Sequence, residues 1–95
     1  MTLMSYSLFI EEKCKKRIEK ATSKNSEFKK ALENKIKHIL ENPYDFKPLR
    51  KPLQNKRRVH ILKSFVLIYD IIEETKTVRL LEINHHDNIY KGAIL

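Results

Sequence analysis

One stretch decides the fold of this chain: Phe65-Val66-Leu67-Ile68-Tyr69-Asp70-Ile71-Ile72. Its first five residues are apolar without alternation, which predicts a central strand that is covered on both faces. Glu73-Glu74-Thr75-Lys76 follows as a predicted hairpin turn, and residues 57–62 and 77–84 are predicted to form strands before and after it. Antiparallel pairing of three consecutive strands therefore predicts a small sheet in the second half of the chain.

The residues before this sheet predict two helices. Ile10, Cys14, Ile18 and Ala21 recur at steps of four, four and three, which places them on one helical stripe. A second helix begins after an Asn25-Ser26 cap and ends before Pro43, because the residue preceding a proline is driven out of the helical region. The stripe of this second helix contains Phe28, Ala31, Leu32, Lys35, Ile36, Ile39 and Leu40. A weaker alternation over residues 4–9 predicts a short first strand.

These elements predict a single α+β domain over residues 1–95, in which an N-terminal helical hairpin packs on a small twisted, mainly antiparallel β-sheet. A chain of 95 residues makes one core and buries roughly 60 to 65% of its unfolded surface, so a second domain is not expected. Residues 44–55 are predicted to be irregular, since Pro43, Pro48 and Pro52 punctuate them.

The net charge of +8 and the pI near 9.7 indicate an anionic partner, because such a surface attracts polyanions over a Debye length. No apolar run approaches the ~20 residues of a membrane span, and the first residues lack the features of a signal peptide. We therefore expect a cytoplasmic protein without membrane contact. Cys14 is the only cysteine, which excludes an internal disulfide and a CxxC motif.

Basic residues concentrate between Asp45 and Asp70, where no acidic residue occurs. They are Lys47, Arg50, Lys51, Lys56, Arg57, Arg58 and Lys63. This segment is predicted to bind RNA, with Phe65 as an adjacent aromatic residue for stacking on a base, and Tyr44 and Tyr90 as further candidates. The lysines of the two helices alternate with glutamates and are interpreted as an ordinary solvated surface.

The strand over residues 57–62 is expected to present Arg58 and His60 on one face, because Val59 and Ile61 point to the core. An imidazole beside a guanidinium can serve in acid–base catalysis on a phosphodiester or in direct RNA contact. The alternative is a surface histidine without a function.

His85-His86-Asp87 does not predict a metal site, since neighbouring side chains in an extended chain diverge and no second ligand pair exists. His86 and Tyr90, four residues apart, would point the same way in a short turn. The sole glycine, Gly92, excludes a glycine-rich phosphate loop, so no cofactor is expected.

Together these residues resemble the RelE/ParE superfamily of toxins from type II toxin–antitoxin systems, and within it the YafQ-like branch of ribosome-dependent mRNA endonucleases. The resemblance covers nearly the whole chain. The motifs that carry it are Pro48-Leu49, Arg58-Val59-His60-Ile61, Ser64-Phe65-Val66-Leu67-Ile68-Tyr69 and His85-His86-Asp87-Asn88-Ile89-Tyr90.

The resemblance implies a RelE fold that enters the ribosomal A site, cuts mRNA there and leaves a 2′,3′-cyclic phosphate, with an acidic or amphipathic antitoxin segment as its cellular partner. The family's histidines fall on His60 and His86, and its aromatic residues on Phe65 and Tyr90. Attack by a ribose 2′-OH needs a base, an acid and positive charge, which the two histidines in either order, and Arg58 with Lys47 or Lys63, would supply without a metal.

Two positions depart from the YafQ-like pattern: Ser64 replaces an acidic residue, and Lys47 replaces a histidine before the Pro-Leu pair. They leave open which groups transfer the protons. Two alternatives to an enzyme also remain: a ParE-like toxin that acts by binding DNA gyrase, and a non-catalytic basic RNA-binding module.

Overall fold

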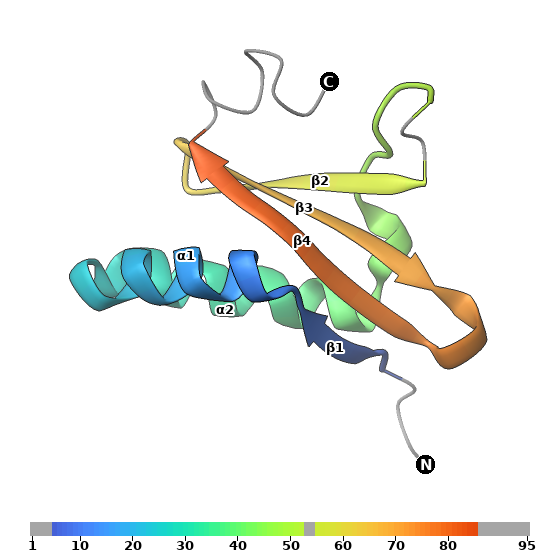
Figure 1. Cartoon of the computed structure of the whole chain (residues 1–95), viewed down its shortest axis with the longest axis horizontal. Coiled ribbons are helices and arrows are strands. Elements are labelled where there is room, and N and C mark those ends of the chain that lie inside the picture. The colour runs from blue at the N-terminus through green and yellow to red at the C-terminus, as the bar shows by residue number, and fades with distance from the viewer. Residues whose placement is uncertain (1–4, 53–54, 86–95) are drawn as a thin grey trace.

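The computed structural model describes residues 5–52 and 55–85, which form two helices packed against one face of a four-stranded sheet (Figure 1). The helices are α1 (Glu12–Lys24) and α2 (Ser26–Glu41), and the strands are β1 (Ser7–Ile10), β2 (Lys56–Ile61), β3 (Phe65–Ile72) and β4 (Thr77–His85). The strand order is β1-β4-β3-β2, and every pair except β1–β4 is antiparallel. The predicted α+β class and the helical hairpin are therefore confirmed.

The N-terminus differs from the prediction, which placed a strand over residues 4–9 and began the helix at Ile10. In the structure Ile10 is the last residue of β1, which runs parallel to β4 at the edge of the sheet (Figure 1). Ser7 N donates to Lys76 O at 2.8 Å and Glu11 N donates to Leu80 O at 3.0 Å. Ile10 nevertheless packs against the core, as the helical stripe predicted, although it does so from the end of a strand.

Local signals set the limits of α2 as predicted. Asn25 is its N-cap, since the side-chain Oδ1 accepts a hydrogen bond from Phe28 N at 3.1 Å. The helix ends at Glu41, directly before Asn42-Pro43. At its other end α2 follows α1 closely, because Asn25 alone separates Lys24 from Ser26. This short connection makes the two helices an antiparallel hairpin (Figure 1).

The hydrophobic core lies between the helices and the sheet. Its buried residues are Cys14, Phe28, Leu32, Ile39, Val59, Ile61, Leu67, Tyr69, Val78, Leu80 and Ile83. Burial raises the pKa of the Cys14 thiol to about 11, so this side chain is a neutral apolar group at physiological pH. A smaller cluster of Leu49, Val66 and Ile68 covers the other face of the sheet, which agrees with the prediction that β3 is covered on both sides.

The segment after α2 is fixed to the sheet by two hydrogen bonds. The buried Tyr69 hydroxyl donates to Pro43 O at 2.6 Å, and Arg57 Nη1 donates to Phe46 O at 2.6 Å. The Phe46 ring also meets the Tyr69 ring edge-on, with centroids 6.5 Å apart. Residues 43–46 therefore have a defined position against β2 and β3.

The turn between β3 and β4 carries an acidic residue that three donors hold in place. Glu73 accepts hydrogen bonds from Tyr6 Oη at 2.7 Å, from Lys76 Nζ at 2.7 Å and from the Tyr44 hydroxyl. These hydrogen bonds, that of Lys76 above all, lower the pKa of Glu73 to about 2. The cluster connects the start of β1, the segment after α2 and the β3–β4 turn.

Replacing Tyr69 with phenylalanine tests the first of these anchors. The ring packing stays, but the buried Pro43 carbonyl loses its donor, so we expect the free energy of unfolding to fall by about 1–3 kcal/mol. Urea unfolding measures this loss. Tyr44→Phe is the control: it removes a hydroxyl whose hydrogen bond to Glu73 lies at the surface, so stability should change by less than in Tyr69→Phe, by about 0.5 kcal/mol. Equal losses in both variants would contradict the anchoring role of Tyr69.

Stability on the acid side should depend on Glu73. Its folded-state pKa is about 2 and its ordinary value is 4.5, so its contribution is complete above pH 4.5 and disappears as the pH falls toward 2. In thermal unfolding between pH 5 and pH 2, the Glu73→Gln variant should therefore lose less of its Tm than the unaltered protein. The neighbouring exposed Glu74 gives the matched variant Glu74→Gln, which should lose as much Tm as the unaltered protein. If Tm fell by the same amount between pH 5 and pH 2 in all three proteins, the role of Glu73 would be refuted.

Candidate functional site

The alternation of β2 places Arg58 and His60 on the face of the sheet away from the helices. Val59 and Ile61 are buried, at 4% and 0% exposure, whereas His60 is exposed and Arg58 is partly exposed. This division of β2 is the one that the sequence predicted.

The register of the sheet brings His60 close to the end of β4. His60 lies opposite Val66 of β3, and Val66 lies opposite Asn84 of β4. Backbones two strands apart are separated by about 10 Å, twice the spacing between neighbouring strands. The last described residue of β4 is His85, so the predicted site residues His86 and Tyr90 lie outside the described part of the chain.

A hollow of about 480 Å³ lies at the outer edge of β2, and we call it the β2-edge hollow. It is lined by Lys35, Asp45, Phe46, Lys47, Arg58, Val59 and His60. Three predicted site residues, Lys47, Arg58 and His60, are therefore brought together from two segments of the chain. Sequence analysis did not assign Lys35, Asp45 or Phe46 to the site.

Lys47 reaches this hollow because its segment pairs with β2. Arg58 N donates to Lys47 O at 3.3 Å, Leu49 N donates to Lys56 O at 2.9 Å, and Pro48 forms an isolated bridge to Arg57. The Leu49 side chain is buried against β3. The Pro48-Leu49 pair thus fixes the position of the lysine that precedes it.

The other predicted RNA-binding residues do not line this hollow. Arg57 turns to the helix side, where it donates a hydrogen bond to Phe46 O and its guanidinium lies 4.9 Å from the centroid of the Tyr44 ring.

The remaining basic residues of this segment lie in the connections and at the start of β2. Arg50, Lys51 and Lys63 are exposed in the connections before and after β2, while Lys56 begins β2 opposite Asp70. Asp70 is buried and forms a two-pronged ion pair with Arg79, at 2.9 and 2.5 Å.

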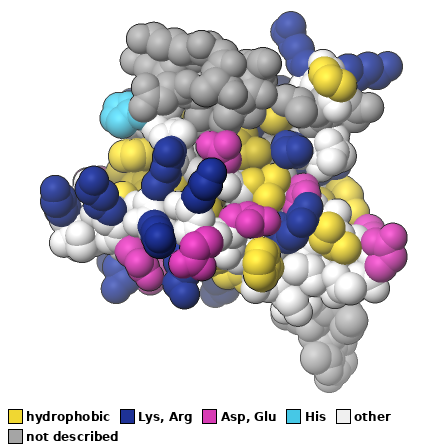
Figure 2. Space-filling model, in the orientation of Figure 1, with side chains coloured by type: hydrophobic (Ala, Val, Ile, Leu, Met, Phe, Trp, Pro, Cys, Tyr) yellow, Lys and Arg dark blue, Asp and Glu magenta, His cyan; other side chains and the backbone are white. Residues whose placement is uncertain are grey.

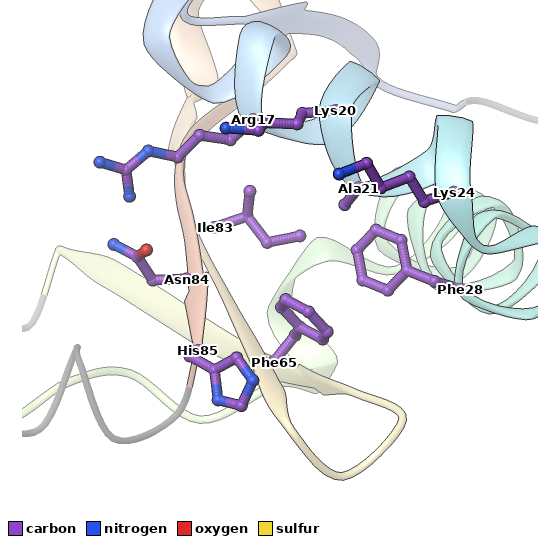
Figure 3. Close-up of a pocket in the computed structure, with 9 residues that line it drawn as sticks. All are labelled: Arg17, Lys20, Ala21, Lys24, Phe28, Phe65, Ile83, Asn84 and His85. Carbon is purple, nitrogen blue, oxygen red and sulfur yellow. The ribbon is translucent and has the colours of Figure 1, made fainter.

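Phe65 belongs to a second hollow, of about 360 Å³, between α1 and the end of β4, which we call the α1–β4 hollow (Figure 3). Its ring centroid lies 4.7 Å from that of Phe28 and 5.1 Å from that of His85. Arg17, Lys20 and Lys24 of α1 lie along one side of this hollow, above an apolar floor (Figure 3). In Figure 2 several lysines and arginines lie over α1 with acidic side chains among them, and other basic side chains lie elsewhere on this face, including its upper right.

Within residues 5–52 and 55–85 no group of three His, Cys, Asp or Glu side chains is arranged to hold a metal ion. His86 and Asp87 of the histidine-rich motif lie outside these ranges. None of the helices in the described part of the chain is both long and apolar enough to cross a membrane.

Comparisons with known proteins agree with this architecture. The isolated E. coli RelE toxin superposes with a TM-score of 0.72 at 22% identity over 95% of this chain and 96% of RelE. RelE in the intact E. coli RelBE toxin–antitoxin complex gives 0.73 at 21% identity, over 84% and 95% of the two chains. A YoeB/ParE toxin from Agrobacterium tumefaciens gives 0.75 at 11% identity, over 84% and 98%. At these identities the likeness shows the fold.

Sequence comparison gives the family. Residues 10–90 match the family described as "ParE toxin of type II toxin-antitoxin system, parDE". The Methanocaldococcus jannaschii protein named "Putative toxin RelE4" is 41% identical over 86 residues, which cover 90% of this chain and 92% of that protein. The chain therefore belongs to the RelE/ParE superfamily and is a toxin of the type II toxin–antitoxin class.

Proposed function

We propose that this toxin is a ribosome-dependent mRNA endonuclease, an mRNA interferase that stops translation by cutting mRNA in the ribosomal A site. The observation that carries the proposal is the β2-edge hollow, which holds His60 together with Arg58 and Lys47. An imidazole that lines the same hollow as two cations is suited to a reaction in which a proton moves and negative charge develops on a phosphate.

The reaction is attack by a ribose 2′-oxygen on the adjacent phosphorus. The new 2′-O–P bond forms as the P–O5′ bond breaks, which gives a 2′,3′-cyclic phosphate and a free 5′-hydroxyl. One group accepts the 2′-OH proton and another donates a proton to the 5′-oxygen; we assign these roles to His60 and His86 in either order. The reaction needs no metal, because Arg58 and Lys47 supply positive charge at the phosphate.

The geometry favours Lys47 over Lys63 as the second cation. Lys47 lines the same hollow as Arg58 and His60, whereas Lys63 lies in the turn after β2 and does not line it. A well-placed donor to the developing negative charge contributes about 3 kcal/mol to catalysis. Tyr90 is assigned a contact with the substrate near His86, since the two residues are four apart in the sequence.

The partner that we propose is a cognate antitoxin with an acidic or amphipathic segment. The related E. coli RelE occurs in a toxin–antitoxin complex, RelBE. In this chain the apolar floor and basic rim of the α1–β4 hollow suit such a segment, as does the net charge of +8. Ribosomes and mRNA are the targets once the antitoxin is removed, so we place the activity in the cytoplasm.

Two other functions would use the same fold. A ParE-like toxin would inhibit DNA gyrase by binding it, and an RNA-binding module would attach to the ribosome without cutting. Neither requires a histidine in a cationic hollow. A cleavage assay on ribosomes programmed with mRNA separates the three: the endonuclease shortens the mRNA, whereas the other two leave it intact.

The two histidines should be needed for toxicity. His60→Ala and His86→Ala are each expected to relieve the growth arrest caused by the toxin without its antitoxin, and to lower the rate of mRNA cleavage by at least about 100-fold. His85→Ala is the matched control, since His85 packs on Phe65 in the α1–β4 hollow. Full toxicity of the His60→Ala, His86→Ala double variant, with unchanged thermal unfolding, would remove both residues from catalysis.

Arg58 should act on the reaction rate and the peripheral lysines on binding. Arg58→Ala is expected to lower the cleavage rate at saturating ribosomes by about 100-fold. Lys51→Ala and Lys56→Ala should leave that rate unchanged, weaken binding, and reduce the slope of log affinity against log salt by about one each. If all three variants lost rate equally at saturation, this division of roles would be wrong.

A further inference from the structure

Lys35 occupies a position of α2 that the helix turns toward the sheet. The buried residues of α2 are Phe28, Leu32 and Ile39, and Lys35 stands three residues after Leu32 and four before Ile39. Positions with this spacing share one face of a helix, and Lys35 is accordingly half-buried. An aliphatic residue would pack at this position equally well, and it would carry no charge that has to remain in contact with water. Packing therefore does not explain why the residue is a lysine.

The ammonium group of Lys35 is directed to one place by an aromatic ring. Its Nζ lies 5.8 Å from the centroid of the Phe46 ring, within the range of a cation–π contact. Phe46 is itself held by the Tyr69 ring at 6.5 Å and the His38 ring at 4.9 Å, and by the bond from Arg57 to its carbonyl. Lys35 therefore presents a positioned charge at the wall of the β2-edge hollow.

The charges around this hollow favour an anion. Its lining contains three cations, Lys35, Lys47 and Arg58, and one carboxylate, Asp45. Asp45 Oδ2 lies 2.9 Å from His38 Nε2, so this carboxylate is engaged with an imidazole. The hollow of about 480 Å³ is many times larger than the ~30 Å³ share of one water molecule, which leaves room for a phosphate group and its ribose.

The hollow also reaches both faces of the sheet. Arg58 and His60 lie on the face away from the helices, whereas Val59 belongs to the core on the helix side and Lys35 comes from α2. β2 is the outermost strand on this side of the sheet. The segment over residues 47–49 pairs with β2 at Lys56–Arg58, so a bound chain would pass from one face to the other beside Val59 and His60, which line the hollow.

We propose that Lys35 binds a backbone phosphate of single-stranded RNA next to the phosphate that reacts at His60, so that the RNA strand crosses the edge of β2 toward α2. This inference rests on the proposed function for the identity of the ligand. It adds a residue from the helical hairpin to a site that is otherwise built from β2 and the segment before it.

The test is the binding of a fluorescent 2′-O-methyl RNA oligonucleotide, which has no 2′-OH and is not cleaved, to the purified full chain at a series of KCl concentrations. Lys35→Met should lower the slope of log affinity against log salt by about 0.7, the value for one phosphate contact on a single strand. Lys35→Arg should retain the slope. The matched variant Lys37→Met removes an exposed lysine of α2 that does not line the hollow, and should retain it too.

Thermal unfolding supplies the second readout. Lys35→Met should unfold at the same temperature as the unaltered protein or higher, because methionine fills the inward position of α2 without a charge. A binding defect with full stability supports phosphate contact, whereas an equal loss of slope in Lys35→Met and Lys37→Met overturns it. Failure of the unaltered protein to bind the oligonucleotide also overturns it.

The outcome is separable from that of the proposed function. Cleavage of mRNA on ribosomes, together with an unchanged salt slope in Lys35→Met, would sustain the endonuclease and remove Lys35 from the site. A slope lost in Lys35→Met alone, together with intact mRNA on ribosomes, would support the RNA path and remove the enzyme.

Discussion

β3 is hydrogen-bonded along both edges, and its pairing with β2 fixes the direction of the β2 side chains in the site. Its register sets Val59 opposite Leu67, and therefore both toward the helices, while His60 and Val66 face the other way. A slip by one residue would bury His60 and expose Val59, because successive side chains of a strand point to opposite faces. The burial of Val59 and Ile61 thus secures the presentation of Arg58 and His60.

The segment that follows α2 converts this sheet into a site. Tyr69 and Arg57, both directed to the helix side, bind the carbonyls of Pro43 and Phe46. The next residues continue along the edge of β2, where Leu49 enters the small core on the opposite face. Core side chains thereby position Phe46 and Lys47, and the β2-edge hollow depends on the same contacts that stabilise the fold.

Sequence patterns predicted the features that depend on neighbouring residues, namely the helices, the strands and their limits. The period of two in β2, the period near 3.6 in α2 and the stops at Pro43 and Glu73 gave elements close to those observed. The parallel pairing of β1 with β4 joins residues 70 apart in the sequence and has no local signal. The placement of Asp45 and Lys35 in the same hollow as His60 has no local signal either. The sequence does show Lys35 within the apolar stripe of α2, and this lysine could have been interpreted as a site residue.

The two hollows open on different parts of the domain, and β3 runs between the elements that line them. Phe65 lies in the floor of the α1–β4 hollow, and its neighbour Val66 faces the side on which His60 is presented. A ligand of one hollow therefore does not share side chains with a ligand of the other, since the lining residues of the two are distinct. Any influence between them can pass through α2, which contributes Phe28 to one hollow and Lys35 to the other, or through β3, whose residues 66–69 are buried and close-packed. This rigidity favours two independently built surfaces on one small domain, so substitutions in one hollow should act additively with substitutions in the other.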